Sequence, residues 1–262
     1  MRTTMFSVLV VLGSAIGLPV PGFGQTVQLR VTVENLAASN GVSFAPLRVG
    51  FSNGTFDAFN NGQVATPPII SVAEGGSGAD WFPAFQAAEP SATLGTVVPN
   101  PAGPLLPGAT ASAVFSINTG VNRFFTFGSM VVPSNDHFIG NDSPTQYQLF
   151  DAGGNLLINA ILQQGRDIWD AGSELTDPVH SAFLVGGTND LRTPQNGVVS
   201  FNFSELSAFN GLTTAAGYVF NSQLTAESDI YRISFAVIPE PASATLVALG
   251  ALGLLALRRR SA

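Results

Sequence analysis

The sequence predicts an all-β fold, an antiparallel β-sandwich, for the central part of the chain. Residues 27–33 and 230–237 alternate apolar and polar side chains, the period-2 pattern of a half-buried strand. The apolar runs between them are short, and loops rich in Gly, Pro, Asn and Ser separate them, as turns require. Twenty phenylalanines supply enough apolar area to fill the space between two sheets.

The strands are expected in the apolar runs of this central part. These are residues 27–33, 47–51, 114–117, 124–132, 146–150, 156–162, 198–203 and 230–237. The segment from Asp151 to Asn155 predicts a hairpin turn. Residues 77–88 predict a helix that Pro83 limits to one or two turns, and the proline-rich residues 98–108 predict an extended loop.

The first 24 residues predict a secretory signal peptide. Arg2 gives a short basic region, residues 5–18 form an apolar core, and small residues follow at 22–24. The apolar core is shorter than the ~20 residues that span a bilayer. A buried first strand is the alternative. The folded body is then residues 26–237, outside the cytoplasm.

Residues 238–262 predict a separate C-terminal segment with a transmembrane helix at 242–257. That stretch is apolar and uncharged, and Arg258, Arg259 and Arg260 follow it. A basic flank stays on the cytoplasmic side of a membrane span, so the body lies on the other side. We therefore expect the chain to be tethered to the inner membrane through this helix.

Composition excludes several classes of function. The chain has 17 acidic and 10 basic residues and no cysteine. An acidic surface is a poor partner for nucleic acid, because binding requires phosphate neutralisation. With no cysteine and two histidines zinc is not expected, and His180, in a Pro-Val-His-Ser loop, is expected at the surface.

Two polar stretches predict a cation site. Asp136 follows an apolar run in VVPSNDHFIGND, and Asp170 and Glu174 bracket an Ala-Gly-Ser turn in WDAGSE. Calcium takes six to eight oxygen ligands from carboxylates, backbone carbonyls and water, and glycine permits the tight turn. A shared site requires the two loops to meet at one end of the sandwich. The alternative is a pair of polar loops that only turn the chain.

The same stretches resemble signatures of spondin N-terminal domains. FGSMVVPSNDHFIG at 127–140 is similar to the family's SM(I/V)(V/I)PSPDWF(V/I)G pattern, and WDAGSE at 169–174 to its DAGTD motif. The resemblance covers residues 26–237 and implies a C2-like antiparallel β-sandwich found in adhesion and matrix proteins. It also implies that Asp136, Asp170 and Glu174 bind Ca²⁺.

This sequence departs from the spondin pattern at three positions. Asn135 replaces a proline, His137 replaces a tryptophan, and Glu174 replaces an aspartate. Histidine is a poor calcium ligand, so His137 is expected to substitute for tryptophan in packing. The longer side chain of Glu174 predicts looser or bidentate binding.

The C-terminus resembles the PEP-CTERM sorting signal of Gram-negative bacteria. The parts that carry the resemblance are Pro239, Glu240 and Pro241, the apolar span, and the arginines at 258–260. The resemblance implies recognition by an exosortase, removal of the span, and delivery to the cell surface or extracellular matrix. A permanently membrane-anchored structural protein is the alternative.

Together these observations predict an exported, non-enzymatic, calcium-binding adhesion or extracellular-matrix module. Its expected partners are the exosortase and an extracellular polysaccharide or surface protein. The competing interpretation is an extracellular hydrolase of matrix polysaccharide. Asp167 and Asp170 could supply its carboxylate pair, although the sequence has no G-x-S-x-G nucleophile motif.

Overall fold

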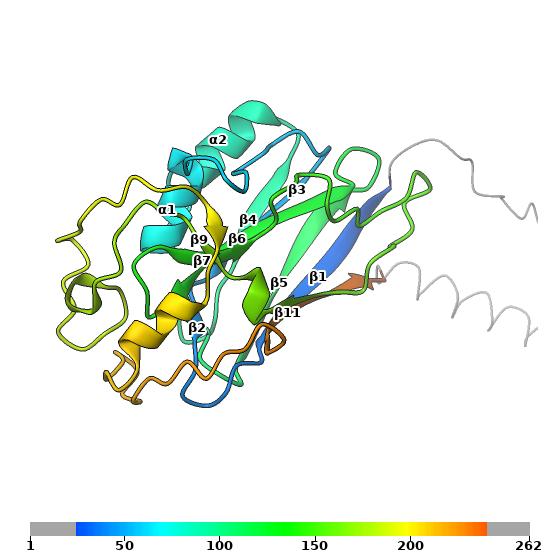
Figure 1. The fold of residues 1–262 in the computed structure, drawn as a ribbon. Helices are drawn as coiled ribbons and strands as arrows, with labels where there is room; N and C mark the ends of the chain where they lie inside the picture. Colours follow the sequence, from blue (N-terminus) through cyan, green and yellow to red (C-terminus); the bar gives the residue numbers. More distant parts are fainter. Residues whose placement is uncertain (1–24, 240–262) are drawn as a thin grey trace, which may run out of the picture.

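The chain folds into two antiparallel β-sheets with two helices on the outer face of one of them (Figure 1). The computed structural model describes residues 25–239. The predicted mostly-β, antiparallel architecture is confirmed. The predicted signal peptide (1–24) and transmembrane helix (242–257) lie outside the described residues. Within residues 25–239, no helix is long and apolar enough to cross a membrane.

The first and last strands of the body form the centre of the smaller sheet. Its four strands, in spatial order, are β5 (Thr110–Asn118), β1 (Thr26–Asn35), β11 (Asp229–Ile238) and β8 (Ala160–Gln164). The predicted alternation is present in β1, where Leu29, Val31 and Val33 are buried. Gln28 pairs with Ile238, so the two ends of the described chain lie side by side.

The larger sheet carries the elements that build the candidate site. In order its strands are β10 (Ser200–Phe201), β9 (Trp169–Asp170), β7 (His137–Gly140), β6 (Phe124–Val132), β3 (Leu47–Ser52) and β4 (Thr93–Val97), with β2 (Ser43–Phe44) also pairing with β6. Strand β6 has the predicted bounds. Nearly all of its residues are buried, because the sheet is covered on both faces.

One apolar core lies between the two sheets. It contains residues of both, including Val31 of β1 and Phe127 of β6. Phe125 of β6 and Phe235 of β11 meet edge to face with ring centroids 4.9 Å apart, which joins the sheets directly. Full burial of one such side chain contributes roughly 1.5–3 kcal/mol. The phenylalanines therefore fill the sandwich as their number predicts.

A second apolar layer lies between the larger sheet and the helices α1 (Pro67–Gly75) and α2 (Trp81–Ala88). Trp81 and Phe85 of α2 are fully buried and pack on Phe56. Gly50 of β3 permits this packing, since a Cβ there would lie 2.2 Å from the Phe85 ring. The predicted helix at 77–88 is α2, which begins later, at Trp81. Helix α1 was not predicted.

The segments between the long strands match the sequence-based predictions in part. The Asp151 N–H donates to the Asn155 carbonyl (3.0 Å), and Gly154 has a φ of 80°, so the predicted turn is present. Residues 146–150, predicted as a strand, contribute only isolated bridges. Residues 98–108 form the predicted loop. Short 3₁₀ helices complete the chain: η1 (Gly165–Asp167), η2 (Pro178–His180) and η3 (Ser204–Phe209).

Candidate functional site

The candidate site lies at one end of the sandwich, where β7 begins and β9 ends. His137 of β7 pairs with Asp170 of β9, which pairs in turn with Ser200 of β10. We call residues 134–137, 170–176 and 202–205 the acidic loop cluster. Figure 1 places β7 and β9 towards one end of the molecule and the first and last described residues at the other.

Asp136 joins the two predicted loops. Its side chain is buried, and Oδ2 accepts hydrogen bonds from the Ser173 N–H (2.8 Å), the Ser173 hydroxyl (3.1 Å) and the Glu174 N–H (3.0 Å). Its backbone carbonyl accepts from the Ala171 N–H (3.2 Å). The loops around Asp136 and 170–174, distant in sequence, are therefore in direct contact.

Asp170 and Glu174 face different neighbours. Oδ1 of Asp170 accepts from the Gly172 N–H (2.7 Å). Glu174 is buried, and neither of its oxygens has a hydrogen-bond partner among the described residues. Its Oε1 lies 3.7 Å from Nε of Arg192, which also pairs with Glu74. Asp136, Asp170 and Glu174 belong to one cluster, but their carboxylates do not all lie within 4.8 Å of one another.

Gly172 shapes the turn between these two acids. Its φ is 64°, and a Cβ at this position would lie 2.7 Å from both the backbone nitrogen and the oxygen of Val198. Its carbonyl accepts from the Gly197 N–H (2.7 Å). The glycine expected from the motif thus permits a left-handed turn and close contact with a neighbouring segment.

Burial makes the charged forms of two of these acids unfavourable. Burial, then the charge of Asp170, raises the pKa of Asp136 to about 7, although hydrogen bonds from Glu174 and Ser173 oppose the shift. Burial also raises the pKa of Glu174 to about 7, with Glu74 and Asp136 adding to the shift and Arg192 opposing it. A bound cation would offset both effects.

These pKa values predict a pH-dependent stability in EDTA. The raised pKa values of Asp136 and Glu174 mean that the folded state holds more protons than the unfolded state between about pH 4.5 and 7. The free energy of unfolding should therefore fall over this range as the pH rises, by at least ~1.4 kcal/mol, the equivalent of one pKa unit. Urea unfolding at a series of pH values measures it. An Asp136→Asn/Glu174→Gln double variant should flatten the curve, and an equal slope in that variant would contradict the assignment.

The structure adds two residues that the sequence did not place in a metal site. His137 is 1% exposed, and neither ring nitrogen has a hydrogen-bond partner in residues 25–239. Glu205 of η3 accepts a hydrogen bond from the Thr176 hydroxyl. Ligand atoms of His137, Asp170 and Glu205 lie within 4.8 Å of one another. Nothing in the sequence around Glu205 marks it as part of a site, because tertiary packing alone brings η3 to β9.

The other predicted candidates lie in local structural contacts. His180 Nδ1 lies 2.7 Å from Asp177 Oδ2, and its side chain is partly exposed. Asp167 Oδ2 accepts from the Gln164 N–H (2.8 Å) at the start of η1. Both contacts are typical of capping and turn stabilisation.

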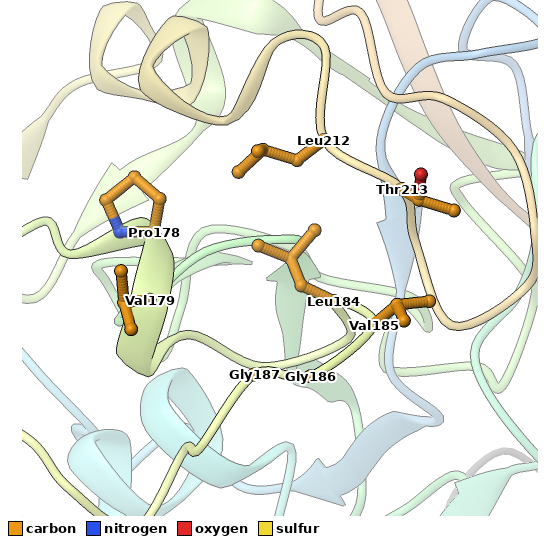
Figure 2. A pocket seen from close by; sticks show the side chains of 8 residues that line it. All are labelled: Pro178, Val179, Leu184, Val185, Gly186, Gly187, Leu212 and Thr213. Carbon is orange, nitrogen blue, oxygen red and sulfur yellow. The ribbon is translucent and has the colours of Figure 1, made fainter.

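An open hollow lies beside η2 (Figure 2). The residues that line it follow the 170–176 loop along the chain. It has a volume of about 350 Å³, and its wall is mostly apolar. The lining residues are Pro178, Val179, Leu184, Val185, Gly186, Gly187, Leu212 and Thr213. Since none of them is acidic or a histidine, the hollow is chemically distinct from the acidic loop cluster.

Comparison with known proteins identifies the tail. Residues 237–260 match the family model described as the PEP-CTERM protein-sorting motif, which confirms that prediction. No match to a spondin N-terminal domain supports the resemblance of the body. No curated protein matches the chain. The motif indicates an exported protein that an exosortase sorts to the cell surface.

Proposed function

We propose that the body is a non-enzymatic, calcium-binding adhesion module of spondin type, displayed on the surface or in the extracellular matrix of a Gram-negative bacterium. The observation that carries this proposal is the contact between the two predicted loops. The Asp136 carboxylate binds the 170–174 turn, which concentrates three acidic residues in one buried cluster.

Asp136, Asp170 and Glu174 would hold the ion. The donors suit calcium in kind, because calcium prefers carboxylate and carbonyl oxygens. The unpartnered oxygens of Glu174 and the raised pKa values of Asp136 and Glu174 support a cation here. Calcium would supply positive charge that offsets repulsion between the two loops. Coordination by all three residues requires side-chain movement, because their carboxylates do not all lie within 4.8 Å of one another.

The position of the cluster supports a role in recognition. The matched sorting motif starts at Val237, in the last two residues of β11, at the end of the sandwich where the described chain begins and ends. The acidic loop cluster lies at the opposite end (Figure 1). A body tethered through its tail would present these loops outward, towards a polysaccharide or a surface protein.

Binding is better supported than hydrolysis. A carboxylate pair for hydrolysis would need Asp167 free to act beside Asp170. The Asp167 carboxylate instead accepts a backbone hydrogen bond in η1.

The test is thermal unfolding of the full chain in EDTA and in calcium. At a calcium concentration a hundred times the Kd, the native state should gain about 2.7 kcal/mol. For a domain of this size the Tm should rise by roughly 5–10 °C. Asp170→Asn should abolish the rise, and the exposed Glu227→Gln should retain it. A Tm that is equal in EDTA and calcium would refute the calcium proposal.

A further inference from the structure

We propose that His137, Asp170 and Glu205 bind a divalent transition-metal ion such as Zn²⁺. The site differs from the calcium site in two of its three ligands and does not rest on it. It also reverses the expectation from composition that zinc has no place in this chain.

The geometry brings the three ligands together from separate elements. His137 begins β7, Asp170 ends β9 beside it in register, and Glu205 comes from η3. Their ligand atoms all lie within 4.8 Å of one another. Zinc binds nitrogen and oxygen ligands at about 2.0–2.2 Å, so donors around one ion must lie within roughly twice that distance. Small side-chain movements therefore suffice to enclose an ion.

The imidazole of His137 is the strongest indication of a ligand. Both of its ring nitrogens are buried and lack hydrogen-bond partners in the described part of the chain. Buried polar atoms are nearly always paired, and leaving one unpaired is destabilising.

Neighbouring groups are placed to orient the ligands. Oδ1 of Asp136 lies 3.9 Å from Nδ1 of His137, while Oδ2 takes the three hydrogen bonds from Ser173 and Glu174. Metal-bound histidines commonly donate their other ring N–H to a carboxylate. The Thr176 hydroxyl holds Glu205, and the Gly172 N–H holds Asp170.

The donor set favours a transition metal over calcium. Imidazole suits zinc and its neighbours in the first transition row, whereas calcium prefers oxygen donors alone. Two carboxylates and a neutral imidazole balance a divalent charge. Within residues 25–239, no arginine forms an ion pair with Asp170 or Glu205. Three protein ligands leave a fourth position for water.

The chain allows a direct test without any substitution. It has only two histidines, so ¹⁵N spectra of labelled imidazoles report on His137 and His180 separately. One equivalent of Zn²⁺ should shift a ring nitrogen of His137 and leave His180 unchanged. An unchanged His137, or a shift confined to His180, would overturn the proposal.

Variants then separate this site from the calcium site, with Co²⁺ as the probe. The full chain should give visible Co²⁺ absorption bands. His137→Gln and Glu205→Gln should weaken Co²⁺ binding roughly tenfold or more, and Glu174→Gln should leave it unchanged. Equal Co²⁺ affinity in the His137 variant would contradict the site. Calcium binding should respond in the opposite way, falling in Glu174→Gln and persisting in Glu205→Gln, so either proposal can fail alone.

Discussion

Replacing Gly172 with alanine is expected to lower the free energy of unfolding by about 3 kcal/mol. An L-residue at its φ of 64° costs roughly 1–2 kcal/mol. The new Cβ would also lie 2.7 Å from two backbone atoms of Val198, and relieving such overpacking typically costs about 1–3 kcal/mol more. Urea unfolding measures the total. Because the turn carries Asp170 and Glu174, the response of the Tm to calcium should disappear as well.

Gly217→Ala is the matched control for this prediction. Gly217 has a φ of 88°, and nothing lies within 4 Å of the position of its Cβ. Its substitution should lower the free energy of unfolding only by the cost of placing an L-residue at a positive φ, about 1–2 kcal/mol. Equal losses in the two variants would show that the contact between Gly172 and Val198 has no energetic role.

Asp136→Ala is expected to destabilise the protein by about 3 kcal/mol in EDTA. The substitution leaves the N–H groups of Ser173 and Glu174 and the Ser173 hydroxyl without their acceptor. Each unpaired buried group costs roughly 1–3 kcal/mol, and water replaces part of the loss. Urea unfolding at pH 7 measures the difference from the unsubstituted chain.

Asp136→Asn separates hydrogen bonding from charge. Its amide oxygen can still accept hydrogen bonds, and it removes the repulsion with Asp170 that helps to raise the pKa of Asp136. We expect a loss of no more than about 1 kcal/mol in EDTA, within the range of one ordinary hydrogen bond. If Asp136→Ala proved as stable as Asp136→Asn, the carboxylate would not be what joins the two loops.

Two kinds of strand were found from sequence: β1 and β11, whose two faces differ in burial, and β6, a long apolar run that is buried almost throughout. Strands β1 and β11 alternate apolar and polar residues, because one face of each strand meets the core and the other is partly exposed. This alternation predicted both strands. Strand β7 is buried at every position, and β9 has only two residues, so neither shows alternation. Helix α1 was not predicted; Pro67 and Pro68 stand in its first turn, where prolines cost no hydrogen bond.

The candidate site was predictable only where its residues are close in sequence. The turn between Asp170 and Glu174 is a local motif, and its glycine has the conformation such a motif requires. The contact between this turn and Asp136 was expected, but the proximity of Glu174 to Arg192, which lies on a later loop, was not. Glu205 reaches Asp170 through the packing of η3, and the unpaired imidazole of His137 follows from burial between strands.

The chain joins an acidic body to a tail that directs it to the cell surface. The tail match indicates export and sorting, and the structure places the acidic loop cluster far from the point where that tail begins. The cluster contains more buried negative charge than its arginine partner can balance, which is why a cation is central to the proposed function.

The most direct measurement is calorimetric titration of Ca²⁺ into the full chain after treatment with EDTA and removal of the chelator. The account predicts saturable binding of one calcium ion per chain, lost in Asp170→Asn and weakened in Glu174→Gln. An absence of binding heat across several temperatures, with the chain folded throughout, would contradict it.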